Sequence, residues 1–330
     1  MRNFYKRKVL WVLLALIFSF CCFSCGNCND DTPIEEEEQQ INLENFHTVF
    51  IDVGYGDSTL IRFPDGKSVL IDCGGTELAK ENIINTLNLY SVTQLDYLIL
   101  TNTLDNHIGN AEYFIQNYGV KNMFIPHVVK PEKIPTFNSA LSLAKSLEVN
   151  VENSEMFKKI TSEDSILLFL APKPLLLDDG GAYLEFNMAK NPTTTQIKNI
   201  SPCFYLEYKD VRILLGGDAD KSQEEYVIEY ANKIYNNYVD DFEINLKEID
   251  VYKMQNHGDE NSNSEPFLNM LKPKYAVVSV GGNNTQAHPS TSAIARLIAA
   301  SPNCNLLRTD TVGNIFLEIN GNGEYTINNE

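Results

Sequence analysis

Polar loops that contain histidine and aspartate follow apolar stretches at several points along the chain. Polar and glycine residues gather at five places, which are residues 52–57, 101–110, 216–218, 256–259 and 284–289. Imidazole and carboxylate groups are the ligands that ions such as Zn²⁺ take in proteins, and a bound ion can activate water for hydrolysis. Because strand ends meet at one rim of a sheet, we expect the five loops to share one site.

Four residues of these loops are the candidates for that site. They are the histidines His107, His257 and His288, and the aspartate Asp218. Simpler structural interpretations stay open. His107 and His288 could be hydrogen-bonded loop residues. Asp218 could cap the helix that is expected after it, because Asp is a good N-cap.

The spacing of apolar residues predicts the elements that must position these loops. Strands are expected at residues 46–51, 58–63, 68–72, 95–100, 122–125, 165–170, 204–208, 211–215, 251–254, 275–280, 305–309 and 314–319. Helices are expected at residues 77–90, 111–118, 139–147, 223–238, 266–271 and 291–299. This order predicts an α+β fold in four layers, an αβ/βα sandwich in which two sheets pack face to face with helices outside.

Two further stretches bear on the site. Asp52 and Asp57 flank a turn with two glycines, and we expect them to hold that turn through backbone hydrogen bonds rather than to act as acid or base. Residues 175–199 form a long irregular stretch with Gly, Asn, Pro and Thr. Loops of that length tend to be functional or mobile.

Six stretches of the chain together resemble one protein family. They are FIDVGYGDSTLIRFPDGKSVLIDCGG, LDYLILTNTLDNHIGN, ILLGGDA, IDVYKMQNHGDENS, PKYAVVSVGGNNTQAHP and LRTDTVGNIFLEI, and they run in order from residue 50 to residue 319. They are similar to the metallo-β-lactamase superfamily, and in particular to the soluble hydrolase domain of ComEC-type DNA-uptake proteins. The resemblance implies the four-layer sandwich for residues 45–330 and a hydrolytic site with two metal ions.

The metal-binding motif departs from the family at several ligand positions. The family's first metal loop resembles Thr-His-x-(His/Asp)-x-Asp-His-x-Gly-Gly. Its first three ligand positions fall here on Asn102, Leu104 and Asn106, and only His107 is retained. The family's His-His-Gly-Ser motif begins here with Asn256. By the resemblance, these four substituted residues are degenerate ligand positions. The resemblance also implies that His107, Asp218 and His257 are the candidate metal ligands, with Asp218 at the position of a bridging aspartate. Asp218, His257 and His288 are the candidate catalytic residues that it implies.

These substitutions weaken the expected catalysis for a physical reason. Two divalent ions ~4 Å apart need several anionic or imidazole donors. Leucine offers no lone pair, and an asparagine amide offers only a weak neutral oxygen. We therefore expect impaired or absent two-metal catalysis, with one Zn or Mn ion held weakly at the retained donors, or none. Asp105 and Asp259 could compensate, although Asp105 is one residue out of register and is expected to point elsewhere.

The N-terminus is typical of a targeting segment. Four basic residues precede an apolar run at 9–24, and Cys25 follows a small residue, which resembles a bacterial lipoprotein cleavage site. We expect residues 1–24 to be a signal peptide, Cys25 or one of the two cysteines before it to carry the lipid, and 25–44 to be an acidic flexible linker. An uncleaved membrane anchor is the alternative.

Charge and cysteine content limit the partners. The formal charge is −18, and an acidic surface repels phosphate backbones, so nucleic acid is not expected as a partner. The expected partner is a membrane of the bacterial cell envelope, reached through the lipid anchor outside the cytoplasm; the sequence identifies no protein partner. Cys28, Cys73, Cys203 and Cys304 remain after processing, and their pairing is open.

Three functions are compatible with these observations. The first is a non-catalytic binding or scaffold domain that keeps the fold of a metallo-hydrolase. The second is an active single-metal hydrolase that acts on a phosphodiester or related ester. The third is a surface lipoprotein that acts through protein contacts, in which the cleft has no role.

Overall fold

A computed structural model describes residues 41–172, 186–231, 242–282 and 284–329. The expected signal peptide, the lipidation residue Cys25 and Cys28 lie outside this part of the chain. Residues 175–185 of the irregular stretch predicted at 175–199 also lie outside it, whereas residues 186–199 are described. The described residues belong to one compact unit, which begins at Ile41.

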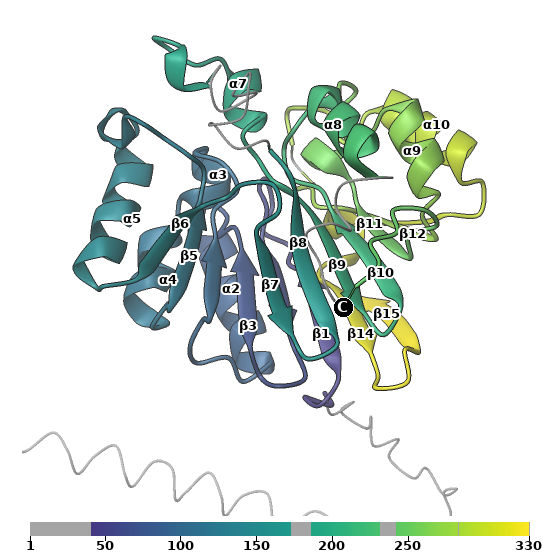
Figure 1. Cartoon of the computed structure of the whole chain (residues 1–330), viewed down its shortest axis with the longest axis horizontal. Helices are drawn as coiled ribbons and strands as arrows, with labels where there is room; N and C mark the ends of the chain where they lie inside the picture. Colours follow the sequence, from purple (N-terminus) through teal and green to yellow (C-terminus); the bar gives the residue numbers. More distant parts are fainter. Residues whose placement is uncertain (1–40, 173–185, 232–241, 283, 330) are drawn as a thin grey trace, which may run out of the picture. The chain divides into compact units, whose positions relative to one another are not determined.

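The first sheet joins both ends of the described chain. Within the described residues it has eight strands in the order β15-β14-β1-β2-β3-β4-β5-β6, and β14 pairs antiparallel with β1 (Figure 1). The strands are β1 (Phe46–Phe50), β2 (Thr59–Arg62), β3 (Ser68–Ile71), β4 (Tyr97–Ile99), β5 (Asn122–Ile125), β6 (Asn150–Asn153), β14 (Ile315–Ile319) and β15 (Tyr325–Asn329). From β3 to β6 the pairing is parallel.

The second sheet has the same mixed character. Its order is β13-β12-β11-β10-β9-β8-β7, with parallel pairing from β10 to β13. The strands are β7 (Lys159–Ser162), β8 (Ser165–Ala171), β9 (Cys203–Tyr208), β10 (Val211–Leu215), β11 (Val251–Lys253), β12 (Tyr275–Val278) and β13 (Asn305–Arg308). The parallel strands of both sheets end near the same rim, which is where the polar loops follow.

Helices cover the outer face of each sheet, and the two inner faces pack on each other. The long helices are α2 (Glu77–Leu89), α4 (Ala111–Asn117) and α5 (Pro135–Ser146) on the first sheet, and α8 (Lys221–Ala231), α9 (Glu265–Leu271) and α10 (Thr291–Ala300) on the second (Figure 1). Short helical turns are α3 (Asp105–Ile108), η1 (Pro131–Lys133), α7 (Thr194–Lys198), η3 (Gln255–Gly258) and α11 (Thr309–Val312).

Alternation along the strands builds three apolar layers. In β1, Phe46 and Phe50 face the core between the sheets, whereas Val49 faces the helices of the first sheet. In β8, Phe169 faces the central core and Leu168 faces the helices of the second sheet. Since successive side chains of a strand point to opposite faces, each sheet contributes to two cores. The predicted four-layer αβ/βα sandwich is confirmed.

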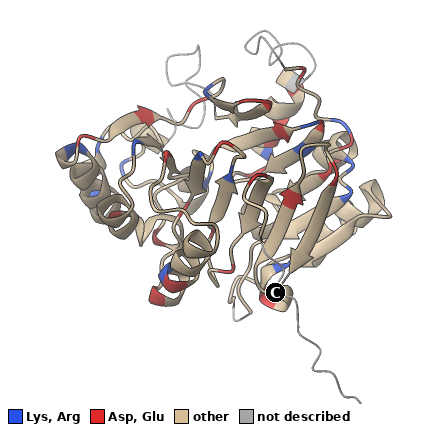
Figure 2. Cartoon of the chain, turned by 90° about the horizontal axis from the view of Figure 1, so that it is seen from below, with Lys and Arg blue, Asp and Glu red and all other residues tan. Residues whose placement is uncertain are grey.

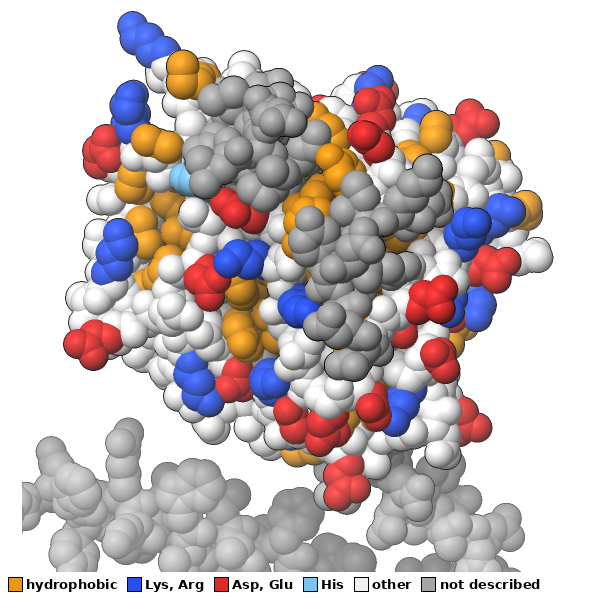
Figure 3. Space-filling view, viewed as in Figure 1, with side chains coloured by type: hydrophobic (Ala, Val, Ile, Leu, Met, Phe, Trp, Pro, Cys, Tyr) orange, Lys and Arg blue, Asp and Glu red, His pale blue; other side chains and the backbone are white. Residues whose placement is uncertain are grey.

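Charged side chains are spread over the outside of this sandwich. Seen from below, acidic and basic residues are scattered over the helices and strand ends and are not gathered by sign (Figure 2). On the visible described surface in Figure 3, hydrophobic side chains form several separate areas among charged ones. Among the described residues, no helix combines the length and apolar character needed to cross a bilayer.

The differences from the predicted elements concern the sheet edges and element ends. β6, β7 and β15 lie at the ends of the strand orders, and their sequences NVEN, KITS and YTINN show little apolar patterning. Edge strands bury little surface, so their sequences need not alternate strongly. α5 begins at Pro135 rather than at residue 139, and Pro is favoured in a first helical turn. The part of the helix predicted beyond residue 231 lies outside the described residues.

The domain begins earlier than the predicted boundary at residue 45. Ile41 and Leu43 pack against the core between the first sheet and its helices. The carbonyl of Leu43 accepts a hydrogen bond from Arg62, and His47 Nε2 donates to the carbonyl of Asn42 at 2.8 Å. Apolar side chains spaced two apart in a polar segment were the missed signal. Cys73, Cys203 and Cys304 are free thiols.

The central core predicts a specific loss of stability. Phe169 is fully buried, with its ring 4.9 Å from Phe124 and 4.8 Å from Phe204 between centroids. We expect Phe169→Ala to lower the free energy of unfolding by about 3–5 kcal/mol, because it leaves a cavity between the sheets. Ile298→Ala, at a residue that is 58% exposed, should change it by about 0.5 kcal/mol or less. Urea denaturation measures both, and equal effects would contradict the assignment of this core.

Candidate metal centre

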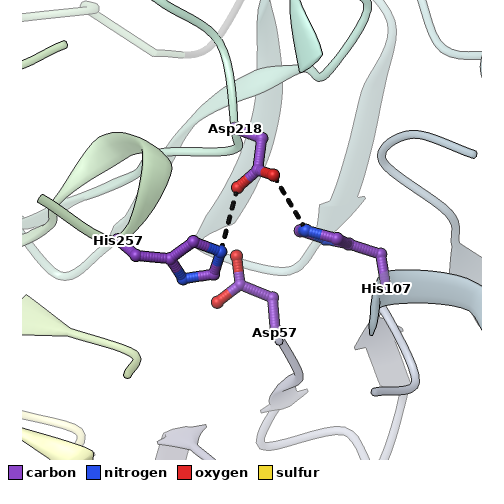
Figure 4. A group of neighbouring side chains, drawn as sticks. All are labelled: Asp57, His107, Asp218 and His257. Atoms are coloured by element: carbon purple, nitrogen blue, oxygen red, sulfur yellow. Dashed lines mark hydrogen bonds and ion pairs between the residues drawn. The ribbon is translucent and has the colours of Figure 1, made fainter. Parts of the chain in front are cut away.

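Four buried side chains from four loops meet at the rim of the two sheets. One ligand atom from each of Asp57, His107, Asp218 and His257 lies within 4.8 Å of the others (Figure 4). Asp57 precedes β2, His107 lies in α3 after β4, Asp218 follows β10, and His257 lies in η3 after β11. The predicted ligands His107, Asp218 and His257 are therefore brought together, with Asp57 as a fourth member.

Two of these loops have backbone features that allow the four side chains to come together. A Cβ atom on Gly56 would lie 2.2 Å from the carbonyl oxygen of Asn106, so only glycine lets these loops approach so closely. Asn256 and His257 have φ angles of 49° and 54°, in the left-handed region that costs a non-glycine residue about 1–2 kcal/mol. Such strain persists where surrounding contacts hold it, and it is frequent at functional sites.

His107 is held between two carboxylates. Its Nδ1 lies 2.8 Å from Asp72 Oδ2, and its Nε2 lies 3.0 Å from Asp218 Oδ2. Asp72 is itself fixed by Thr101, whose backbone N–H and hydroxyl donate to its two oxygens at 2.8 and 2.6 Å. A carboxylate that binds the far nitrogen of an imidazole orients the ring and directs the other nitrogen toward a metal.

His257 is oriented in the same way by the backbone. Its Nδ1 lies 2.8 Å from the carbonyl oxygen of Ser279, and since a carbonyl can only accept, Nδ1 donates. The lone pair of the neutral ring is then on Nε2, which lies 3.3 Å from Asp218 Oδ1 (Figure 4). Asp218 therefore stands between two imidazoles that both direct Nε2 toward it.

The side chains present fit one divalent ion. Asp57 Oδ1, Asp218 Oδ1 and His257 Nε2 are buried atoms with no hydrogen-bond partner in the described part of the chain. An unpaired buried polar atom costs about 1–3 kcal/mol, so three together call for an additional binding partner. Two imidazoles and two carboxylates form a donor set suited to Zn²⁺ and to similar divalent ions.

The carboxylates also determine the protonation of the metal-free site. Burial by itself lowers the pKa of His107, but Asp218 and then Asp72 raise that pKa well above 6.5. The pKa of Asp218 would rise through burial, yet His107 and His257 hold it far below 3.8. In the absence of metal, His107 therefore keeps its proton and Asp218 keeps its charge.

Asp57 and Lys253 are the residues that the sequence analysis missed. Lys253 Nζ donates to Asp57 Oδ2 at 2.9 Å and to the carbonyl of Gly216 at 3.1 Å, and both side chains are buried. The prediction that the Asp57 side chain holds the glycine turn through backbone hydrogen bonds is wrong, because its Oδ2 binds Lys253 and its Oδ1 has no hydrogen-bond partner among the described residues. Asp52 does hold the turn, since its Oδ1 accepts from Gly54 N–H at 3.0 Å. A lysine inside the buried strand β11 was the available signal.

The four degenerate positions lie outside the cluster, and the side chains of two of them bind other groups. Asn102 is fully buried; its amide donates to Ser201 Oγ at 3.1 Å and accepts from the N–H of Leu104 at 2.9 Å. Asn256 Oδ1 accepts from Lys198 Nζ at 2.6 Å. The amide nitrogen of Asn106 is buried with no partner in the described residues. Three of the four substituted positions thus carry amides, and two of those hold parts of the loop around α7.

Two predicted carboxylate interpretations can be settled. Asp218 does not cap α8, because Asp220 Oδ1 accepts the N–H of Ser222 at 2.9 Å at the start of that helix. Asp105 points away from the cluster, as predicted, and its Oδ1 accepts from Thr136 at 2.8 Å.

His288 lies beside the cluster rather than within it. Its ring centroid is 6.1 Å from that of His257, and its Nε2 is 3.7 Å from Asp259 Oδ2. Asp259 is likewise outside the four-residue group. The loop of residues 284–289 therefore reaches the site, and its His288 ring stacks beside that of His257.

The fold and this cluster define the class of protein. The chain belongs to the metallo-β-lactamase superfamily, whose sequence model matches residues 51–282. It is similar to ComE operon protein 3 of Bacillus subtilis (strain 168), with 28% identity over 281 residues, which are 80% of this chain and 32% of that protein. It is also similar to competence protein ComA of Neisseria gonorrhoeae, with 26% identity over 266 residues, 79% of this chain and 30% of that one.

A solved structure supports the fold alone. The CmlA β-hydroxylase E377D mutant has a TM-score of 0.50 and 12% identity, over 83% of this chain and 54% of that one. The chain spans about a third of the length of the curated relatives given above. The predicted resemblance to ComEC-type proteins is confirmed.

The raised pKa of His107 predicts how the metal-free protein responds to pH. A raised folded-state pKa gives stability that is fully present below the unfolded value of 6.5 and is lost as pH rises through the folded value. The lowered pKa of Asp218 gives stability that is lost as pH falls below 3.8. We therefore expect the pair of His107 and Asp218 to stabilise the metal-free domain most between pH 3.8 and pH 6.5.

The test is urea denaturation in EDTA, at a pH below 6.5 and at one well above it. Wild-type protein should lose stability toward the higher pH, and His107→Gln should lose distinctly less. An identical pH dependence in both proteins would contradict the assignment. His127→Gln, at a histidine outside the cluster, is the control.

Proposed function

We propose that this chain is an envelope-anchored, ComEC-like metallo-β-lactamase-fold protein that holds one divalent ion and has lost two-metal catalysis. The observation that carries the proposal is the convergence of four donor atoms within 4.8 Å, while Asn102, Leu104 and Asn106 stand outside the group. One donor set supports one ion, and the remaining described side chains of these loops supply no second set.

The charges around the site also support a single metal ion. Asp57, Asp72 and Asp218 are buried carboxylates, and together they balance one divalent ion and the ammonium group of Lys253. A second divalent ion would add charge that no further buried carboxylate of the cluster offsets. Uncompensated buried charge is strongly unfavourable, so binding of the second ion should be weak or absent.

The ion is expected to be Zn or Mn and to be held weakly. Asp57 already accepts a hydrogen bond from the ammonium group of Lys253, and this ion pair reduces the negative charge that Asp57 offers to a metal. His107 and His257 present Nε2, Asp218 joins them, and Asp72 and Ser279 fix the two rings. A bound ion supplies Lewis-acid polarisation of an oxygen ligand. The role of the chain's own residues is to bind that ion and to keep the two rings oriented.

A single-metal hydrolase is the second candidate, and one observation favours it. A cavity of about 350 Å³ lies against Asp218 and is also lined by Lys198 and Asn256. A small ester could reach a metal at Asp218 from this cavity. Nucleic acid is not proposed as the substrate, because the formal charge of −18 disfavours it.

Metal counting tests the proposal. In equilibrium dialysis against rising Zn or Mn, elemental mass spectrometry should find binding that saturates at about one equivalent per chain, and a chelator should remove it. Asp218→Asn and His257→Ala should each lower the affinity by at least about tenfold, because each removes a ligand. His127→Ala should retain the full equivalent.

Activity distinguishes the two candidate functions. The loaded protein should hydrolyse bis(p-nitrophenyl) phosphate no faster than buffer with the same metal. Two tightly held equivalents with chelator-sensitive turnover would contradict the proposed loss of two-metal catalysis. Turnover with one equivalent, abolished by His257→Ala, would establish the single-metal hydrolase.

Lipid anchoring is tested separately. The support for it is the short apolar run that ends at a cysteine in the N-terminal segment. In a bacterial host, the wild-type chain should incorporate labelled fatty acid and sediment with membranes, whereas Cys25→Ser should lose the label. Cys28→Ser should keep it. Label that persists in Cys25→Ser would place the modification elsewhere or show that the segment is an uncleaved anchor.

A further inference from the structure

The segment of residues 198–201, at the end of α7, is bound to the loops that build the metal centre. Lys198 Nζ donates to Asn256 Oδ1 at 2.6 Å, and Ser201 Oγ accepts from Asn102 Nδ2 at 3.1 Å. Both asparagines stand where the family has histidine. The amides of Asn102 and Asn256 are therefore bound to this segment.

A third attachment fixes the same segment to the loop that carries Asp218. Asn199 and Asp220 exchange two hydrogen bonds: the amide of Asn199 donates to Asp220 Oδ2 at 2.9 Å, and the N–H of Asp220 donates to Asn199 Oδ1 at 2.8 Å. Asn199 and Ser201 are buried. Three side-chain attachments to three different loops hold the backbone beside Lys198 in one place.

This arrangement brings a positive charge to the centre. Lys198, Asp218 and Asn256 line the same cavity of about 350 Å³. Although burial alone would raise it, the pKa of Asp218 is lowered by His107, by His257 and, less strongly, by Lys198. The carboxylates of Asp218 and Asp220, which also line the cavity, have the partners described above.

We propose that Lys198 takes the place of the second metal ion, as a fixed cation that Asn102 and Asn256 hold through segment 198–201 at former ligand positions. By the resemblance, Asp218 is at the position of an aspartate that bridges two cations. Here it would bind one metal ion, and the fixed ammonium of Lys198 would lie across the shared cavity from it. An ammonium needs no ligand set of lone pairs, so the loss of donors at positions 102, 104 and 256 is compatible with a structured site. This inference deepens the proposed single-metal function and rests on it for the first ion.

The decisive experiment restores the three lost ligands of the first metal loop, with and without Lys198. The restored variant carries Asn102→His, Leu104→His and Asn106→Asp, and its pair carries Lys198→Met in addition. Zn bound per chain is counted by native mass spectrometry. We expect the variant without Lys198 to bind one equivalent more than its partner, because the ammonium no longer occupies the second position. Equal counts in the pair, whatever their value, would overturn the inference.

A second measurement needs no restored ligands. In the otherwise unchanged chain, Lys198→Met should tighten Zn binding by about tenfold, because it removes a positive charge from the cavity that Asp218 lines. Lys198→Arg, which keeps the charge, should leave the affinity within about twofold of wild type. Lys221→Met is the matched control: Lys221 lines the same cavity, but its ammonium has no partner among the described residues, and a smaller change of about threefold or less is expected.

The outcomes separate this inference from the proposed function. A wild-type chain that binds no Zn would contradict the single-metal proposal, while the paired restored variants would still report on Lys198. Equal tightening by Lys198→Met and Lys221→Met would indicate a general surface charge effect and would overturn the specific role of Lys198. Circular dichroism and the urea midpoint of each variant establish that it is folded.

Discussion

The contact of His107 with two buried carboxylates holds the site together. Asp72 follows β3 and His107 follows β4, both in the first sheet, whereas Asp218 follows β10 in the second. The imidazole therefore links the two halves of the sandwich at the rim where the polar loops meet. In the metal-free protein, the proton of His107 attracts the carboxylate of Asp218. A divalent ion bound between His107 Nε2 and Asp218 would supply a positive charge at the same place.

The two asparagines that replace metal ligands, Asn102 and Asn256, also hold segment 198–201 in place. Histidines at positions 102 and 256 would direct imidazoles toward a second ion. The asparagines found there instead form hydrogen bonds to Ser201 and Lys198. An amide can donate and accept at once, so it suits a role in holding a loop better than a role as a metal ligand. The single retained donor set and the attached segment 198–201 are consistent with one metal ion at Asp218 and one ammonium held at Asn256 in the same cavity.

The sequence predicted the parts of this structure that rest on strong local patterns. Central strands such as β8, with its run of buried apolar residues, and the two sheets around them were predicted, as was the meeting of the five loops. Edge strands such as β15 were missed because their side chains are mostly polar. Asp57 was misjudged because a turn between glycines explains an aspartate locally, whereas its partner Lys253 lies 196 residues away. Lys198 gave no signal, since its role depends on contacts that only the folded chain creates.

Anomalous diffraction at the zinc edge, on crystals of the mature chain grown with excess Zn²⁺, tests the central claim most directly. The account predicts one strong peak among Asp57, His107, Asp218 and His257, with the ammonium of Lys198 ordered against Asn256. Two peaks about 4 Å apart, the spacing of a two-metal site, with Lys198 displaced, would contradict it.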